Sequence, residues 1–220
     1  MTQVCGPHAT LADLFAPWLD SDGQAWEHWC PDVKVAGITA DSREVDTNYV
    51  FFARAGTETD GLNFVNDALD AGAVAVVTRN DLKPEQRLDY GVPTLRSGAL
   101  NTRLGAVADR WFSKPSRALR VAGVTGTNGK TSVTHFVAHA LTELGHCCGV
   151  MGTLGYGLFG GPMTRLGLTT PGVVDVHRAL AELRASGAEF VALEASSHAL
   201  SQGRLEGVHF DTAAFTNLSQ

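Results

Sequence analysis

The chain has 220 residues, of which 44% are hydrophobic and 18% are charged, and its formal net charge is -6 at pH 7. A chain of this size and composition is globular with room for one or two cores, and its acidic balance, without a Lys/Arg run, argues against a nucleic-acid partner. No apolar run approaches the ~20 residues of a membrane span, and no basic-then-apolar signal segment is present, so we expect no membrane insertion and a cytoplasmic location. The four cysteines form no CxxC pair, which favours free thiols.

The first 114 residues alternate between helix-like and strand-like patterns. The expected helices are 10–19, 60–72 and about 98–112. The expected strands are 33–39, 49–53, 73–77 and a short segment ending at 95. Thr10 and Asp13 have the spacing of a capping box, and Asp60 can cap the second helix. Because Pro115 and its flanking serines stop the pattern before a new strand begins, we place a domain boundary between residues 114 and 115.

The second half repeats this alternation. The expected strands run from 119 to about 125 and over 148–151, 190–193 and 212–215. The expected helices are 133–144 and a segment ending at Gly187, with Thr170 as its N-cap and Pro171 as its first residue. Strands that alternate with helices indicate an α/β fold with a mainly parallel sheet in each half.

A glycine-rich loop separates the strand near 121 from the following helix. Its sequence is Gly126-Thr127-Asn128-Gly129-Lys130-Thr131-Ser132. Strand, glycines, Lys-Thr and helix in this order are typical of a phosphate-binding P-loop, although the outer glycine, Gly123, stands one residue earlier than usual. Glycines let the backbone wrap a phosphate, the helix N-terminus supplies N–H groups, and Lys130 adds a full charge, while the Thr131 hydroxyl can ligate Mg²⁺. The alternative is a glycine-rich turn that binds nothing.

Two further patterns concern the segments around this loop. The helix after it is expected to bury an apolar stripe of Val133, Phe136, Val137, Ala140, Leu141 and Leu144. A G-x-G-x-x-G match at 155–160 opens no helix and is followed by no acidic residue about 20 positions on, so we reject a dinucleotide site there.

Several polar residues are candidates for chemistry. Glu194 follows a buried strand, where a carboxylate can hold Mg²⁺, and the alternative is a solvated strand-end glutamate. His135 and His139 have the spacing of a zinc pair but lack the accompanying glutamate, so a packed or exposed helix face is favoured. His198 and Arg204 could each contact a ligand or serve the structure alone, and position decides neither.

Taken together, these residues resemble the Mur ligases, the ATP-dependent amino-acid ligases of peptidoglycan synthesis. The P-loop carries the family's displaced outer glycine. The matching motifs are Asp41-Ser42-Arg43, Val50-Phe51-Phe52-Ala53, Asp60-Gly61, Met151-Gly152-Thr153, Thr169-Thr170-Pro171, Glu194-Ala195-Ser196-Ser197-His198-Ala199-Leu200, Gln202-Gly203-Arg204 and Phe215-Thr216-Asn217-Leu218-Ser219. The later motifs resemble the branch that adds meso-diaminopimelate or L-lysine to UDP-MurNAc-L-Ala-D-Glu.

The resemblance implies roles for particular residues. Ser42 is expected to contact the uridine nucleotide, and Gly126 to Ser132 the phosphates of ATP, with Lys130 as the catalytic cation. Thr131 and Glu194 are expected to serve Mg²⁺. The residues expected to hold the muramoyl dipeptide are Thr169, Thr170, Ser196, Gln202 and Arg204. The implied reaction forms an acyl phosphate from ATP, which an incoming amine, meso-diaminopimelate by preference, converts into an amide.

The chain also departs from the pattern of the family that it resembles. The usual Pro-Gly-Asp turn is replaced by Thr47-Asn48-Tyr49, and Leu168 stands where some relatives have a substrate-binding Asn. Family members continue past Ser219 into an Asp-His motif, a carbamylated lysine and a C-terminal amino-acid-binding domain. We therefore expect a uridine-nucleotide-binding domain over 1–114 and an incomplete central domain over 115–220, which are inactive alone. We also expect a monomer, although the sequence itself does not show the oligomeric state. The rival functions are an L-lysine-adding ligase, a P-loop kinase, a folylpolyglutamate-type ligase and a non-catalytic UDP-nucleotide-binding module.

Overall fold

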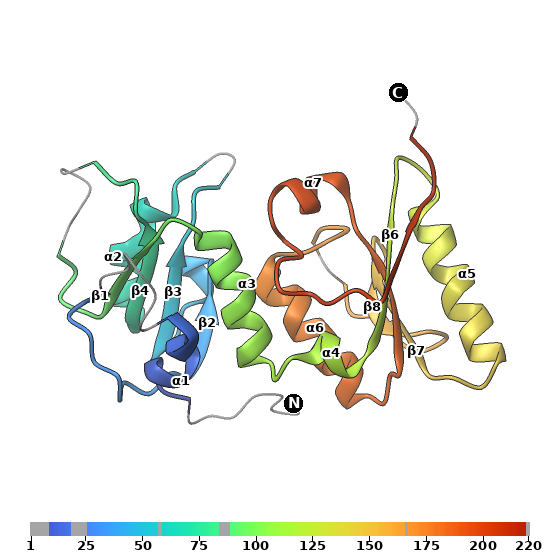
Figure 1. Cartoon of the computed structure of the whole chain (residues 1–220), viewed down its shortest axis with the longest axis horizontal. Helices are drawn as coiled ribbons and strands as arrows, with labels where there is room; N and C mark the ends of the chain where they lie inside the picture. The colour runs from blue at the N-terminus through green and yellow to red at the C-terminus, as the bar shows by residue number, and fades with distance from the viewer. Residues whose placement is uncertain (1–8, 19–25, 57–58, 84–88, 166, 219–220) are drawn as a thin grey trace. The chain divides into compact units, whose positions relative to one another are not determined.

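The computed structural model describes residues 9–18, 26–56, 59–83, 89–165 and 167–218. The chain divides into two compact units, one of Gly6–Val107 and one containing Ala108–Gln220. Each unit holds its own five-stranded sheet, drawn in Figure 1, and each is described by itself. Two mainly parallel sheets confirm the expected α/β class. In the described part of the chain, no helix combines the length and the apolar character that crossing a membrane requires.

The N-terminal unit is built on a sheet with the strand order β1-β5-β4-β3-β2. Its strands are β1 (Trp26–Glu27), β2 (Gly37–Thr39), β3 (Tyr49–Ala53), β4 (Ala73–Arg79) and β5 (Thr94–Ser97). Its helices are α1 (Leu11–Phe15), α2 (Val65–Asp70) and α3 (Leu100–Trp111), with short 3-10 turns η1 (Ala16–Trp18), η2 (Ser42–Glu44) and η3 (Gly61–Phe64). Strands β2 to β5 are parallel to their neighbours, and only β1 is antiparallel, so the carboxyl ends of four strands share one edge.

Strand β3 places successive aromatic side chains on opposite faces of this sheet. Phe51 packs on one face with Val65 and Ala68 of α2. Phe52 faces the other way and stacks on Phe15 of α1, with ring centroids 6.4 Å apart. Because side chains alternate along a strand, both faces of β3 are buried. This explains why its sequence is a continuous apolar run.

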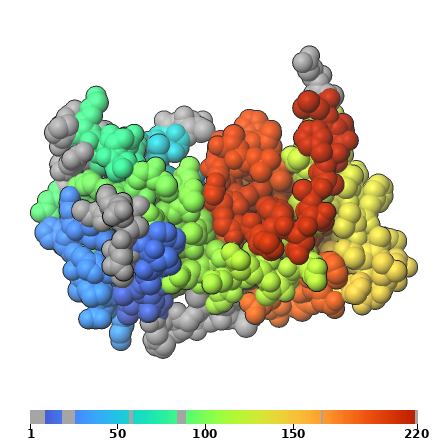
Figure 2. Space-filling model, in the orientation of Figure 1, coloured from blue at the N-terminus to red at the C-terminus, as the bar shows by residue number. Residues whose placement is uncertain are grey.

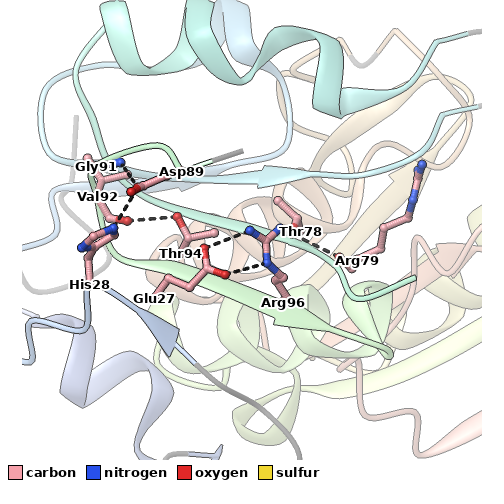
Figure 3. A network of polar contacts seen from close by, with 9 residues as sticks. All are labelled: Glu27, His28, Thr78, Arg79, Asp89, Gly91, Val92, Thr94 and Arg96. Atoms are coloured by element: carbon pink, nitrogen blue, oxygen red, sulfur yellow. Dashed lines mark hydrogen bonds and ion pairs between the residues drawn. The ribbon is translucent and has the colours of Figure 1, made fainter. Parts of the chain in front are cut away.

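Polar contacts fasten the short antiparallel strand β1 to β5 (Figure 3). Arg96 on β5 donates from Nε and Nη2 to the two carboxylate oxygens of Glu27, at 3.1 and 2.9 Å. Nearby, His28 Nε2 lies 2.8 Å from Asp89 Oδ1, which also accepts from the backbone N–H of Gly91 (Figure 3). The two-pronged Arg96–Glu27 contact is directional and fixes the register of a strand that is only two residues long.

The expectations for this unit hold with shifted boundaries. The capping box of Thr10 and Asp13 is confirmed, but α1 ends at Phe15 and continues only as a 3-10 turn to Trp18, while residue 19 lies outside the described part. The strand expected over 33–39 shrinks to Gly37–Thr39. The Asp60 cap is confirmed, since its carboxylate accepts from the Leu62 N–H, yet it caps a 3-10 turn that leads into α2.

The second unit has the strand order β10-β6-β9-β7-β8. Its strands are β6 (Arg120–Thr125), β7 (Cys148–Gly152), β8 (Gly155–Leu158), β9 (Phe190–Glu194) and β10 (Thr212–Phe215). Its helices are α4 (Pro115–Ala118), α5 (Lys130–Glu143), α6 (Val173–Ala185) and α7 (Ser197–Ser201). All neighbours are parallel except β8, which forms a hairpin with β7.

Helices α5 and α6 cover opposite faces of this sheet (Figure 1). Leu180 and Leu183 of α6 pack with Val191 and Leu193 of β9 in the larger core. Ala138 of α5 packs with Cys148 and Val150 of β7 in a smaller one. At the edge of the sheet, all four residues of β10 are exposed, and Figure 2 shows this last segment in red at the surface.

Three expectations for this unit are wrong. Helix α5 does not bury the predicted stripe: Phe136 is 72% and Leu144 75% exposed, and the helix packs through Thr134 and Ala138 instead. Small residues on that face let the helix lie close to the strands it contacts, β6, β7 and β9. Helix α6 begins at Val173 after Gly172, so Thr170 is not its N-cap and Pro171 is not its first residue.

Other expectations for this unit are confirmed, and one strand was not predicted. Gly187, with φ of 93°, ends α6 as expected, and β10 occupies the predicted residues. The rejected G-x-G-x-x-G match opens no helix, because it forms the unpredicted strand β8. The described cysteines are free thiols, and burial raises the pKa of Cys148 to about 11.

Candidate functional site

The loop between β6 and α5 has the shape that phosphate binding requires. Gly126 has φ of 132° and Gly129, the N-cap of α5, has φ of 82°, so both need a residue without Cβ. Gly123, by contrast, lies inside β6, where a Cβ would come within 2.9 Å of the Phe210 ring. Gly123, the outer glycine, therefore allows β6 to pack closely against Phe210, and the phosphate-binding loop itself begins at Gly126.

Lys130 folds back over the loop that precedes it. Its Nζ donates to the backbone carbonyls of Gly126 and Thr127, at 2.7 and 3.1 Å. The ammonium is thus held over the loop near the first turn of α5, where the helix dipole favours negative charge. Ser132, on the same turn, is exposed.

The residues after β10 clamp the other side of the loop. The Asn217 side chain accepts from the Asn128 N–H through Oδ1 at 3.2 Å and donates to the Asn128 carbonyl through Nδ2 at 3.1 Å. The Asn217 carbonyl accepts from the Thr127 N–H at 3.0 Å. The Thr216 hydroxyl donates to the same Asn128 carbonyl at 2.6 Å. A Cβ on Gly126 would collide with this Thr216 hydroxyl. The loop shape is therefore fixed from the adjacent strand.

Glu194 lies at the carboxyl end of β9 with only 2% of its surface exposed. Its Oε2 accepts from the hydroxyls of Thr131 at 3.0 Å and Thr153 at 3.1 Å, and its Oε1 accepts from the Thr153 N–H at 3.0 Å. A Cβ on Gly152 would lie 2.0 Å from Oε1, so this carboxylate needs a glycine beside it. Burial with these donors rejects the solvated strand-end alternative.

The pair of Thr131 and Glu194 fits a magnesium ion. Mg²⁺ takes octahedral oxygen ligands at about 2.0–2.1 Å, which places neighbouring ligands about 2.9 Å apart. The 3.0 Å between Thr131 Oγ1 and Glu194 Oε2 matches that spacing. Such ions are usually held by one or two protein oxygens, the remaining ligands being water and phosphate. Among the described residues, no cluster of three or more His, Cys, Asp or Glu forms a different metal site.

Three of the expected substrate residues lie around the end of β9. The buried Thr170 donates its hydroxyl to the Glu194 carbonyl at 2.8 Å and accepts from the Ser196 N–H at 3.3 Å. Ser196 caps α7, since its Oγ accepts from the Ala199 N–H. The Thr169 hydroxyl lies 3.2 Å from the Thr153 hydroxyl. Thr170 therefore ties its segment to the strand end rather than starting α6.

The remaining two expected substrate residues, Gln202 and Arg204, are hydrogen-bonded to each other. Arg204 donates from Nε and Nη2 to Gln202 Oε1, at 2.9 and 2.5 Å, and from Nη1 to the Thr170 carbonyl at 2.8 Å. These bonds bring the turn after α7 against the Thr170 segment. The structure thus gathers all five expected substrate residues in the same unit as the P-loop.

Ser42 belongs to the N-terminal unit. It follows β2 as the first residue of η2, at the carboxyl edge of the parallel strands, where open α/β sheets bind ligands. The neighbouring Asp41 carboxylate accepts from the Arg43 N–H at 3.0 Å and from its guanidinium, and the hydrogen bond from the Arg43 side chain lowers the Asp41 pKa. Thr39 braces the same turn by accepting from the Asp41 N–H.

In the described part of the chain, the other candidates give no side-chain hydrogen bond to this cluster, although the His198 carbonyl accepts from the Gln202 N–H. His135 and His139 both lie edge-on to Phe159, with ring centroids 5.8 and 5.9 Å away, and His139 is exposed, which agrees with the packed or exposed helix face favoured from the sequence. His198 and Leu168 are exposed.

Sequence reasoning assigned no role to two residues that contact the site, Thr153 and Asn217. Both lie inside motifs that match the family. Thr153 directly follows the carboxyl end of β7, and Asn217 lies two residues beyond the carboxyl end of β10. The rule that ligands bind at this edge of an open sheet is the signal that could have found them.

Comparison with known families matches both halves of the chain. The profile described as "Mur ligase family, catalytic domain" matches residues 34–112, and that described as "Mur ligase middle domain" matches residues 124–220. The two matches cover the Ser42 turn, Lys130, Glu194 and Arg204.

Individual relatives agree with these profiles. A UDP-N-acetylmuramoyl-L-alanyl-D-glutamate--2,6-diaminopimelate ligase of Xanthomonas oryzae pv. oryzae is 47% identical over 189 residues, covering 86% of this chain and 38% of the relative. A protein of the same name from Alkalilimnicola ehrlichii is 43% identical over 96% of this chain and 42% of its own length. A solved structure with this name has a TM-score of 0.77 at 29% identity, covering 97% of this chain and 41% of that one. The chain therefore spans about two fifths of the length of the relatives it matches.

Proposed function

The chain belongs to the Mur ligase family, and we propose that it supplies the ATP-phosphate and muramoyl-peptide sites of a ligase that adds meso-diaminopimelate to UDP-MurNAc-L-Ala-D-Glu. The observation that carries the proposal is the buried Glu194 carboxylate, 3.0 Å from the first-turn hydroxyl of a P-loop helix. The names of relatives at 43–47% identity favour diaminopimelate over L-lysine. The protein acts in the cytoplasm, as a monomer.

Each element of the site has a separate task in this proposal. The N–H groups at the start of α5 and the Lys130 ammonium hold the terminal phosphates of ATP. Thr131 and Glu194 hold Mg²⁺, which, when bound, neutralises charge on the phosphates. When ATP binds, Lys130 exchanges the carbonyls of Gly126 and Thr127 for phosphate oxygens.

The muramoyl dipeptide then lies beside this phosphate site. Thr169, Thr170 and Ser196 line the segment next to Glu194, and Arg204 offers a planar guanidinium of five N–H donors, three of which make the bonds described above. An anionic group of the dipeptide meets the other two. Positioning of the substrate carboxylate against the γ-phosphate forms an acyl phosphate and ADP, and the incoming amine displaces phosphate to give the amide. Ser42 of the N-terminal unit contacts the uridine nucleotide.

The experiment that tests the phosphate site is Lys130→Ala. We expect ATP affinity, measured with a fluorescent ATP analogue in millimolar Mg²⁺, to fall by about 1.5–3 kcal/mol, the range for one hydrogen bond to a charged group. Lys34→Ala removes the same charge from an exposed position and should leave affinity unchanged. An unchanged affinity in Lys130→Ala would refute the P-loop assignment. Uridine-nucleotide binding with no ATP binding in the unaltered chain would favour the non-catalytic module instead.

A further inference from the structure

Thr153 is the first residue after β7 and contacts two residues of the proposed site at once. Its hydroxyl lies 3.1 Å from Glu194 Oε2 and 3.2 Å from the Thr169 hydroxyl, and its N–H donates to Glu194 Oε1. A hydroxyl carries one hydrogen, and a carboxylate only accepts. Thr153 therefore donates to Glu194 and accepts from Thr169, which gives a directed chain from Thr169 through Thr153 to Glu194.

These bonds restrain the plane of the carboxylate, so that one oxygen stays directed at the phosphate loop. The Thr153 N–H occupies Oε1, on the side where Gly152 leaves no room for a side chain. Oε2 is left toward Thr131, at 3.0 Å. Loss of the Thr153 hydroxyl removes one of the three hydrogen bonds described above that hold this carboxylate, so its last torsion, which is intrinsically broad, becomes less restrained.

We propose that Thr153 is a positioning residue of the magnesium site: its hydroxyl orients the Glu194 carboxylate and links it to the dipeptide-binding residue Thr169. This inference rests on the proposed function above. Partners of this kind hold metal ligands in place, and their loss typically lowers metal affinity by 10–100-fold.

The position of Thr153 makes this role separable from folding. The residue is exposed, outside the hydrophobic cores, and its N–H bond to Glu194 is independent of the side chain. Thr153→Val keeps the branched shape and removes only the hydroxyl, while Thr153→Ser keeps the hydroxyl. Thr142→Val, on the last turn of α5, is a matched control for loss of an exposed threonine hydroxyl.

The test compares ATP affinity in millimolar Mg²⁺ with ATP affinity in EDTA, by calorimetry, for the whole 220-residue chain. The ratio of the two affinities isolates the contribution of the metal. We expect Thr153→Val to lower this ratio about 10-fold with the EDTA affinity unchanged. Thr153→Ser and Thr142→Val should keep the ratio of the unaltered chain.

The outcomes separate this inference from the proposed function. If the unaltered chain shows no gain from Mg²⁺, the metal site fails, and the inference fails with it. If the gain is present and Thr153→Val keeps it, the metal site stands and the positioning role is wrong. An equal loss in Thr153→Ser and Thr153→Val also overturns the role, because the hydroxyl is then not the active group.

The link to Thr169 adds a second readout. In a chain of hydrogen bonds, removing either hydroxyl breaks the same connection, so the losses in Thr153→Val and Thr169→Val should not add in the double variant. Additive losses in the Mg²⁺ ratio would show that Thr169 acts separately from Thr153.

Discussion

His177 on α6 is a fully buried histidine beside a buried aspartate. Its Nε2 donates to the Glu206 carbonyl at 2.9 Å, and its Nδ1 lies 4.0 Å from Asp109 Oδ1. Neither Nδ1 nor Oδ1 has a hydrogen-bond partner among the described residues. Burial lowers the pKa of His177 and raises the pKa of Asp109, so each side chain resists its charged form. The pair therefore makes the second unit sensitive to pH.

The direction of this sensitivity follows from proton linkage. The pKa of His177 is lower in the folded chain than its unfolded value near 6.5, so the unfolded chain binds the proton first. Stability should fall as pH drops below about 6.5, by at most about 1.4 kcal/mol per pH unit. Asp109 acts in the opposite sense, because folding raises its pKa. Its contribution to the free energy of unfolding therefore declines as pH rises above about 4.

Urea unfolding at pH 7.5 and 5.5 measures how much His177 contributes to this pH dependence of stability. We expect the difference in unfolding free energy between the two pH values to shrink in His177→Gln, whose amide can still donate to the Glu206 carbonyl. The difference between pH values is the quantity of interest, whatever the variant's absolute stability. The same difference in both proteins would remove His177 as its source.

Among the elements, the end of β10 determines the shape of the P-loop. The Asn217 side chain makes two hydrogen bonds with the Asn128 peptide group. We expect Asn217→Ala to weaken ATP binding by about 1–3 kcal/mol, since each ordinary hydrogen bond contributes about 0.5–1.5 kcal/mol. The same ATP titration measures it. Leu218→Ala, at a neighbouring residue that is 85% exposed, should bind ATP as the unaltered chain does. Normal affinity in Asn217→Ala would mean that the loop keeps its shape unaided.

How far the elements could be predicted depends on what limits each one. Strands β3, β6 and β9 follow from apolar runs, and the P-loop from its glycines and Lys-Thr, because these signals are local. The stripe through Phe136 was wrong because helical spacing alone does not say which face meets the sheet. The buried residues of α5 are Thr134 and Ala138, and Thr131 contacts Glu194 from the first turn of the same helix.

The misplaced start of α6 has a similar cause. Thr170 and Pro171 carry good local signals for a helix N-terminus, but the Thr170 hydroxyl bonds to the Glu194 carbonyl, 24 residues away in the sequence. A long-range partner of this kind leaves no trace in local spacing. For the same reason, Glu194 could be singled out from its strand end, but the Thr153 contact that orients it could not.

At the scale of the whole molecule, helix α3 contains the division between the two units. The units separate between Val107 and Ala108, within α3, whereas the sequence places the boundary between 114 and 115. Asp109, Trp111 and Phe112 therefore group with the second unit and are at most 8% exposed. The boundary at 114 stays a prediction that unfolding experiments can test.

The two boundaries differ in what they leave with the second unit. We expect a chain of residues 108–220 to be more stable than one of residues 115–220 by at least about 2 kcal/mol, because the shorter chain lacks two large buried aromatic side chains and uncovers His177. Urea unfolding monitored by circular dichroism measures both. Equal stabilities would instead support a boundary at 115.

The open edge of the second sheet has a consequence for how the protein behaves in concentrated solution. Strand β10 is exposed along all four residues and carries no charge or proline, and among the strands that the structure describes it pairs with β6 alone. A strand edge of this kind presents a row of backbone donors and acceptors to any extended peptide nearby. We expect two copies to pair strand to strand along β10 and so begin to aggregate, and Ala213→Lys is a small change that would discourage this pairing.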